Sequence, residues 1–208
     1  MPNWCSNSLT TTNKEIIAKL RECEAAGNED ILDAFVPMPA GMRGYLSGSA
    51  TAPDGTHVHL WKHGPDNEVI PINPAEEAEL IANYGTASWY DWSVNAWGTK
   101  WDAANTRFNI TDTEATVWFD TAWSPPEAWL ATVIAEHPEG RTQLAYAEGG
   151  MGYFGRFVYV DGELVVNEFN DDDFWDVEKD WDDVEDSMEM LTPSCRAHLE
   201  AYGLWTGG

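Results

Sequence analysis

The stretch that most constrains the fold is residues 89–102, which read WYDWSVNAWGTKWD and hold four of the twelve tryptophans. A buried tryptophan removes roughly 200 Å² of surface from water, and its indole N–H then needs an acceptor. At about 25 cal/mol per Å², each enclosed ring contributes on the order of several kcal/mol before conformational entropy is subtracted. So dense a cluster requires the rest of the fold as its wall, which predicts a core and corner motif; an aromatic binding platform is the alternative. The predicted structural aromatic motif comprises Trp89, Tyr90, Trp92, Trp97, Trp101, Asp102 and Trp123.

Hydrophobic periodicity and turn residues predict an α+β chain. Thr12 with Glu15 three residues later has the pattern of a capping box and predicts a helix that ends at Gly27. Further helix starts are predicted at residues 73–74, 124–125 and 192–193, where Asn, Ser or Thr precedes Pro. The predicted strands cover residues 4–11, 105–110, 115–121, 144–148, 157–160 and 164–166. The last two flank Asp161-Gly162, a strong hairpin signal.

Four segments in chain order carry a resemblance: MPNWCSNSLT, NAWGTKWD, FDTAWSPP and YAEGGMGYFGRF. Together they resemble the YubB-like ferredoxin-fold family of phage and plasmid accessory proteins, over residues 1 to about 162. The resemblance implies a ferredoxin-like α+β sandwich and an origin in a mobile element. It brings no established activity and no catalytic residues.

The predicted element order is β-α, an insertion, then β-β-α-β with an added hairpin. This is the ferredoxin-like order, and it implies an antiparallel sheet with helices on one face. We therefore expect a ferredoxin-like α+β domain over residues 1–167, interrupted by an insertion at about 40–73 that holds a hairpin around Pro53-Asp54-Gly55. Residues 168–208 are expected to form an acidic, aromatic-containing C-terminal extension that packs on this domain.

The charge balance limits the possible partners. Thirty-six acidic residues against eleven lysines and arginines give a net charge of −25. Such a field repels nucleic-acid phosphates and anionic membrane surfaces, whereas it attracts basic protein surfaces. The predicted partner is thus a basic host protein, with no direct nucleic-acid and no membrane contact. The chain has no apolar run of about 20 residues and no signal-peptide pattern, so we expect a protein of the bacterial cytoplasm.

The strongest concentration of charge lies between Glu168 and Glu189, with twelve acidic residues and one lysine. Interleaved aromatic residues distinguish this run from a purely solvated tail. We expect it to be partly helical, with its apolar side on the domain and its carboxylates outward. The predicted partner-binding residues are Asp171, Asp172, Asp173, Phe174, Trp175, Asp176, Glu178, Asp180, Asp182, Asp183, Glu185 and Asp186.

Metal and cofactor motifs are weak. His57, His59 and His63 could share a metal if residues 57–61 form a strand, but solvent-facing histidines are the favoured interpretation. The acidic run lacks the EF-hand pattern, and GGMGYFG matches no phosphate-binding loop. The three cysteines are too far apart in sequence for a CxxC site and are expected to be buried thiols. We predict no metal and no cofactor.

No catalytic constellation is recognisable, so the chain is not expected to be an enzyme. The isolated carboxylates Asp91, Asp102, Asp120 and Glu148 are predicted to accept hydrogen bonds from tryptophan N–H groups.

Three functional hypotheses follow. The first is an accessory protein that binds a basic host protein, as an acidic inhibitor or DNA mimic directed at a nucleic-acid-handling defence protein. The second is a small-molecule or nucleotide-binding module, or an enzyme, that uses the tryptophan-rich groove; an anionic ligand would require local cations. The cations considered are Lys62, Lys100, Arg107 and Arg156. The third, direct nucleic-acid binding by the sheet, is disfavoured by the charge.

Overall fold

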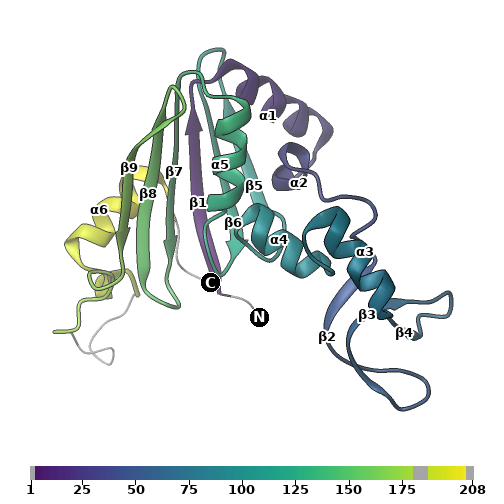
Figure 1. Ribbon diagram of the computed structural model, residues 1–208. Coiled ribbons are helices and arrows are strands. Elements are labelled where there is room, and N and C mark those ends of the chain that lie inside the picture. The colour runs from purple at the N-terminus through teal and green to yellow at the C-terminus, as the bar shows by residue number, and fades with distance from the viewer. Residues whose placement is uncertain (1–2, 180–186, 205–208) are drawn as a thin grey trace.

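The computed structural model describes residues 3–179 and 187–204, which contain a six-stranded and a three-stranded antiparallel sheet (Figure 1). The larger sheet has the order β5-β6-β1-β7-β8-β9 and the smaller one β2-β3-β4. The strands of the larger sheet are β1 (Trp4–Thr11), β5 (Ala104–Ile110), β6 (Ala115–Ala122), β7 (Arg141–Glu148), β8 (Tyr153–Val160) and β9 (Glu163–Asn170). The helices are α1 (Lys14–Ala26), α2 (Ile31–Phe35), α3 (Pro74–Tyr84), α4 (Trp89–Trp97), α5 (Glu127–Glu136), α6 (Pro193–Tyr202) and the 3-10 helix η2 (Ser187–Met190).

A ferredoxin-like unit forms the centre of the molecule. Along the chain it runs β1-α1-β5-β6-α5-β7, and in space its strands lie in the order β5-β6-β1-β7. Every neighbouring pair in the sheet is antiparallel. The predicted fold class is therefore confirmed, and the predicted hairpin β8–β9 extends the sheet beyond β7. Its turn places Asp161 and Gly162 at φ angles of 48° and 84°, the left-handed conformation that the Asp-Gly signal predicts.

The core lies between this sheet and the helices α1 and α5. Leu9 on the central strand β1, Leu20 on α1 and Trp129 on α5 are buried there. Asn7, also buried on β1, donates hydrogen bonds to Cys5 O at 2.8 Å and to Thr121 Oγ1 at 2.9 Å. Because a buried amide without partners would be costly, these bonds are a condition for placing a polar residue at the middle of the sheet.

Two predicted helix caps are wrong by one or two residues. Asn13, not Thr12, caps α1, accepting hydrogen bonds from the backbone N–H groups of Glu15 and Ile16. Helix α5 begins at Glu127 after Pro126, and Ser124 donates its hydroxyl hydrogen to Gly98 O instead of capping the helix. In both places the side chain expected to cap the helix forms a hydrogen bond to a distant residue instead: Thr12 to Arg141 and Ser124 to Gly98.

The insertion between α1 and β5 contains α2, the three-stranded sheet, α3 and α4. Its strands are β2 (Tyr45–Thr51), β3 (His57–His63) and β4 (Val69–Pro71). The predicted hairpin is present, since Ala50 pairs with Val58 and Leu46 with Trp61. Figure 1 shows β2–β4 and α3 projecting to one side of the larger sheet, with α4 next to α5.

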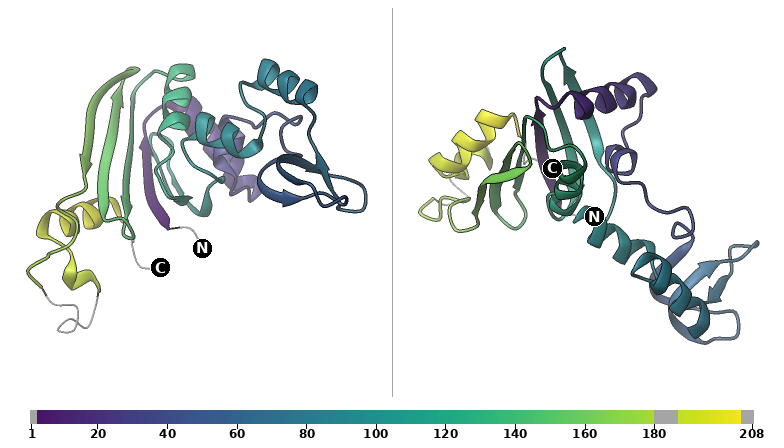
Figure 2. Two further views of the ribbon diagram at one scale, coloured as in Figure 1. Left: turned by 60° about the horizontal axis from the view of Figure 1, so that its bottom comes forward. Right: turned by 45° about the horizontal axis from the view of Figure 1, so that its top comes forward.

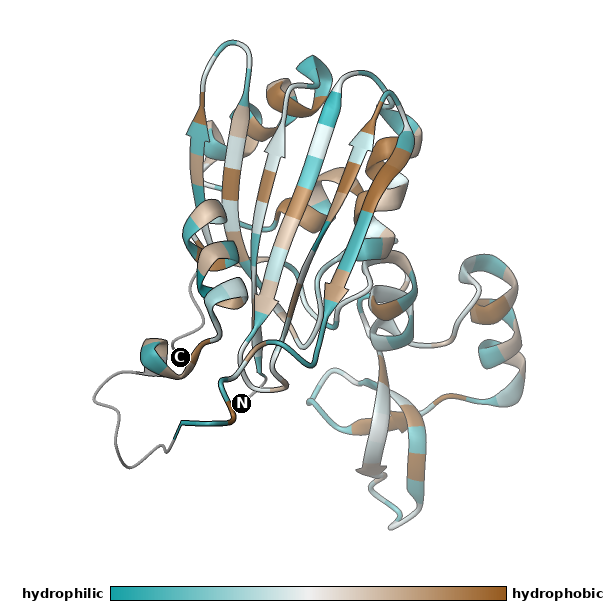
Figure 3. Cartoon of the chain, turned by 90° about the vertical axis from the view of Figure 1, so that its left-hand side faces the viewer, coloured by the Kyte–Doolittle hydropathy of each residue, from teal (hydrophilic) through white to brown (hydrophobic). Residues whose placement is uncertain are grey.

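The C-terminal segment covers the opposite face of the sheet. Phe174, Leu191 and Leu199 pack with Ala145 and Phe154 of β7 and β8 in a second core, and the right-hand view of Figure 2 shows α6 and α5 on opposite sides of the strands. Figure 3 shows the corresponding alternation of apolar and polar residues along the strands. The division at residue 168 remains a prediction, and β9 runs through it to Asn170.

The prediction of a partly helical acidic run is not met in its described first part. Residues 171–179 form bends and turns, with a single bridge between Trp175 and Leu191. Among the described residues of the run, those of η2 are helical, and α6 follows them. Three consecutive aspartates and the interleaved aromatic residues give this stretch low helix propensity, and Phe174 is buried next to Phe154 and Trp175 without forming part of a helix.

Among the described residues, no helix combines the length and apolar character needed to cross a membrane.

Docking of α6 is expected to weaken in acid. The imidazole of His198 lies against β7, with Nε2 at 3.2 Å from Tyr146 O, and burial lowers the pKa of His198 to about 4. A histidine held neutral contributes stability above its ordinary pKa of about 6.5, and this contribution is lost as the pH falls towards 4. Urea titrations at several pH values should show a steeper loss of unfolding free energy over this range in the wild type than in His198→Gln. Identical pH profiles would contradict the assignment.

Candidate functional site: the tryptophan cleft

The tryptophan stretch forms α4 and the turn that follows it. Ser88 caps α4 by accepting from Asp91 N–H, and Gly98 ends it at a φ of 83°. A Cβ atom at Gly98 would lie 3.2 Å from Glu127 N, so glycine allows the chain to pass close to the start of α5. Trp97 is buried and donates its indole N–H to Val36 O at 2.9 Å.

The prediction of a uniformly structural aromatic motif is only partly right. Trp97 lies in the core, and Trp89 and Trp92 are half-buried against it. Tyr90, Trp101 and Trp123, in contrast, are 39%, 38% and 46% exposed. The nine-residue helix α4 can bury only one face, so Tyr90 on its other face and Trp101 beyond its end reach the surface, whereas Trp123 lies directly after β6.

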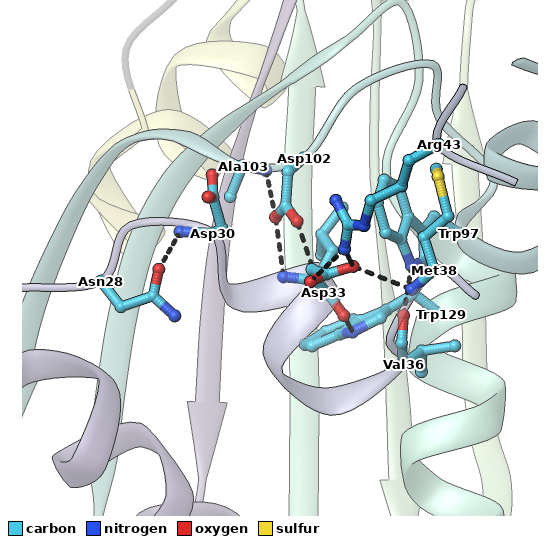
Figure 4. A network of polar contacts seen from close by, with 11 residues as sticks. Asn28, Asp30, Asp33, Val36, Met38, Arg43, Trp97, Asp102, Ala103 and Trp129 are labelled. Carbon is cyan, nitrogen blue, oxygen red and sulfur yellow. Dashed lines mark hydrogen bonds and ion pairs between the residues drawn. The ribbon is translucent and has the colours of Figure 1, made fainter. Parts of the chain in front are cut away.

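Trp89, Trp97 and Trp101 border a cavity of about 300 Å³, which we call the tryptophan cleft. It lies where the α2 region meets the end of α4 and the start of β5 (Figure 4). It is lined by Asp30, Asp33, Met38, Arg43, Trp89, Trp97, Lys100, Trp101 and Asp102. Aromatic walls, three carboxylates and two cations thus meet in one hollow.

Asp102 is the structural carboxylate of the tryptophan cleft. Its Oδ1 accepts hydrogen bonds from Leu32 N–H at 2.8 Å and Ala103 N–H at 2.7 Å, and its Oδ2 accepts from Asp33 N–H at 2.8 Å. Burial raises the pKa of Asp102 to about 6, although the three backbone hydrogen bonds oppose this shift. Asp102 therefore caps α2 from a distant part of the chain, while Asp30 at the cap position makes no capping bond.

The prediction that the isolated carboxylates accept from tryptophan N–H groups is wrong for the four residues considered. Asp102 and Glu148 accept from backbone N–H groups, Glu148 from those of Gly150 and Met151. Asp91 accepts from Ser88, and Asp120 accepts from the side chains of Ser6 and Asn105. The indole donors of Trp97, Trp118 and Trp129 use backbone carbonyls, whose positions the sequence alone does not reveal.

Both cations of the tryptophan cleft are already in contact with acidic or aromatic groups of the chain. Arg43 Nη2 contacts the two carboxylate oxygens of Asp33 at 2.6 and 2.7 Å. Lys100 Nζ lies over the ring of Trp101, 4.6 Å from its centroid, and over Tyr90 at 5.6 Å. Trp101 in turn packs against Trp4 on β1, with ring centroids 6.3 Å apart.

The cations that a bound anion would need are not gathered. Of the four considered from sequence, only Lys100 lines the tryptophan cleft. Lys62 pairs with Glu76 in the insertion, Arg156 pairs with Glu168, and Arg107 lies over Trp118. The sequence does not identify Arg43 as a candidate, because this residue lies in a Gly-rich loop without a motif.

The acidic run is anchored by the aromatic residue expected to contact a partner. Phe174 is 1% exposed and packs in the second core, so it cannot serve as an interface anchor, and Trp175 is half-buried beside it. Asp171, Asp172 and Glu178 are exposed, and Asp173 and Asp176 are half-buried. Asp180, Asp182, Asp183, Glu185 and Asp186 lie outside the described residues.

The three candidate histidines all lie on β3 and are exposed. His57 and His63 contact Thr51 Oγ1 and Asn67 O through their Nδ1 atoms. Within the part of the chain that the structure describes, no group of three or more His, Cys, Asp or Glu side chains is placed to hold a metal ion. All three cysteines are buried, and burial raises the pKa of each thiol.

The match to a family model supports the ferredoxin-like assignment. Residues 96–192, less than half of the chain, match the family model described as the ferredoxin-like domain in Api92-like protein. A crystal structure of protein api92 from Yersinia pseudotuberculosis aligns with 82% of this chain and 98% of its own, at 12% identity and a TM-score of 0.43. No curated protein matches the chain. Neither match names a YubB-like, phage or plasmid family.

Replacing Asp102 should test its role as the distant cap of α2. Asp102→Ala leaves the N–H groups of Leu32 and Asp33 without their acceptor, and we expect a loss of about 2 kcal/mol in unfolding free energy. Urea titration of the wild type and variant measures this difference. Asp91→Ala, which removes an exposed carboxylate from α4 and leaves the Ser88 cap in place, serves as a control with a smaller expected effect. Equal effects would contradict a special role for Asp102.

Proposed function

We propose that the protein acts by binding a basic protein partner, with the acidic C-terminal segment as part of the contact surface. The observation that carries this proposal is the net charge of −25, concentrated in a segment that is anchored to the fold. Electrostatic attraction of this kind raises association rates and favours oppositely charged surfaces.

The anchoring supports a defined surface over a loose tail. Phe174 inserts into the second core, and Thr192 donates its hydroxyl hydrogen to Asp173 O. The bridge between Trp175 and Leu191 adds a further attachment. Asp171 and Asp172 are therefore held close to the edge of the sheet while remaining exposed. Carboxylates held in this way lose less conformational freedom on binding than those of an unattached chain.

The proposed partner belongs to the class of nucleic-acid-handling proteins, whose basic surfaces bind phosphates. Exposed carboxylates can occupy the positions of phosphates on such a surface, so the protein would act as an acidic inhibitor or DNA mimic. The resemblance to phage and plasmid accessory proteins favours a defence protein of the bacterial cytoplasm as the target.

A small-molecule or nucleotide ligand is the alternative, favoured by the tryptophan cleft itself. Its volume of about 300 Å³ is at the lower end of the range for ligand pockets. Its carboxylates outnumber its cations, however, and both cations already have partners. This balance disfavours phosphate-bearing ligands.

Affinity capture with the full-length chain tests the proposed function. The wild type should retain a basic, nucleic-acid-handling protein from bacterial lysate at low salt and release it at high salt or with duplex DNA. A variant with Asp171→Asn, Asp172→Asn and Glu178→Gln should bind that protein about tenfold more weakly.

The matched control carries Glu22→Gln, Glu24→Gln and Glu136→Gln, which remove the same charge from exposed positions on α1 and α5. It should bind nearly as well as the wild type. Equal retention by all three proteins, or retention of nothing by the wild type, would argue against the proposal.

A further inference from the structure

The chain's own side chains show which chemistry the tryptophan cleft accommodates. Lys100 places its ammonium group over two aromatic rings, and Arg43 places its guanidinium on Asp33. Both are contacts that a cationic ligand would make, since the faces of tryptophan and tyrosine attract positive charge. Two cations of the chain thus lie at the cleft, one over the ring of Trp101 and one on the carboxylate of Asp33.

One carboxylate of the tryptophan cleft remains available. The side chain of Asp30 is exposed, lines the cleft and forms no hydrogen bond or ion pair with any residue in the described ranges 3–179 and 187–204. The N–H groups at the start of α2 donate to Asp102, so the carboxylate of Asp30 is not needed to cap this helix. Figure 4 shows both carboxylates beside the start of α2.

The ion pair between Arg43 and Asp33 can be broken, and Asp33 paired with another cation, at a small cost in free energy. The side chains of Arg43 and Asp33 are 54% and 29% exposed, and a pair open to solvent contributes about 0–1 kcal/mol. An incoming guanidinium can therefore replace that of Arg43 on Asp33 while Arg43 turns to solvent.

The side chains in and beside the tryptophan cleft favour a side chain of a protein over a free metal ion as the ligand. Among the described residues, no group of three or more His, Cys, Asp or Glu side chains is placed to hold a metal ion. The aromatic surface also continues out of the tryptophan cleft from Trp101 to Trp4, both more than one-third exposed. Exposed tryptophans such as Trp101 and Trp4 beside a pocket are typical anchors of protein interfaces.

We propose that the tryptophan cleft takes one arginine side chain of a basic protein partner, between the tryptophan rings and the carboxylates of Asp30 and Asp33. This rests on the proposed function, because it assigns a contact to the same class of partner. Arginine is the cation that fits best: its planar guanidinium stacks on aromatic faces and binds carboxylates through two parallel hydrogen bonds.

Titration of the full-length protein with a short peptide tests the proposal. The probe is acetylated, amidated GSGRGSG, compared with peptides that carry lysine or neutral citrulline in place of arginine. Indole N–H signals in ¹H–¹⁵N spectra report binding, and Trp89→Phe and Trp101→Phe assign two of them. We expect saturable shifts of Trp89 and Trp101, weaker for lysine and absent for citrulline.

Asp30→Asn supplies the decisive variant, because it removes charge from the cleft without removing a capping bond. It should weaken binding of the arginine peptide about fivefold. Glu24→Gln, which removes an exposed charge from α1, should change the affinity less than twofold. Equal effects of the two substitutions, equal binding of citrulline, or shifts confined to other tryptophans would overturn the proposal.

The two proposals fail separately. If a basic protein is captured but the peptide does not bind in the tryptophan cleft, the proposed function stands and the arginine site is wrong. If the peptide binds as expected but no basic protein is captured, the cation site stands and the proposed protein partner is wrong.

Discussion

The three hydrogen bonds that Asp102 accepts from backbone N–H groups hold together the part of the molecule on which the candidate site depends. Two of them, from Leu32 and Asp33, join the segment just before β5 to the short helix α2, which has only five residues and no local side-chain cap, and the third, from Ala103, is local. A helix of this length has little stability of its own, because its nucleation is not repaid by propagation. Its position is therefore fixed from outside.

Two buried tryptophans complete this attachment. Trp129 of α5 donates to Leu32 O, and Trp97 of α4 donates to Val36 O. Together with the segment of Asp102, α4 and α5 therefore converge on residues 32–36 (Figure 4). Each contact satisfies polar groups on both sides, as buried donors and acceptors require. The aromatic stretch and α2 consequently stabilise one another, and the tryptophan cleft is the space left between them.

The sequence predicts the sheet well because its signals are local. Alternating residues and turn residues mark the strands, and Asp161-Gly162 marks the β8–β9 turn. The capping role of Asp102 could not be predicted in the same way, since its partner Leu32 lies 70 residues earlier in the chain. Arg43 and Asp33 likewise carry no motif, and the exposure of Trp101 depends on where α4 ends. The missed parts of the site are thus the contacts between distant segments.

The most direct test of the account is a double-mutant cycle on the tryptophan cleft. Affinities are measured for the wild type and Asp30→Asn, each with the arginine peptide and its citrulline counterpart. If the guanidinium contacts the carboxylate of Asp30, the two changes should be non-additive, with a coupling energy of about 1 kcal/mol. Strictly additive effects would show that the arginine binds elsewhere and would contradict the account.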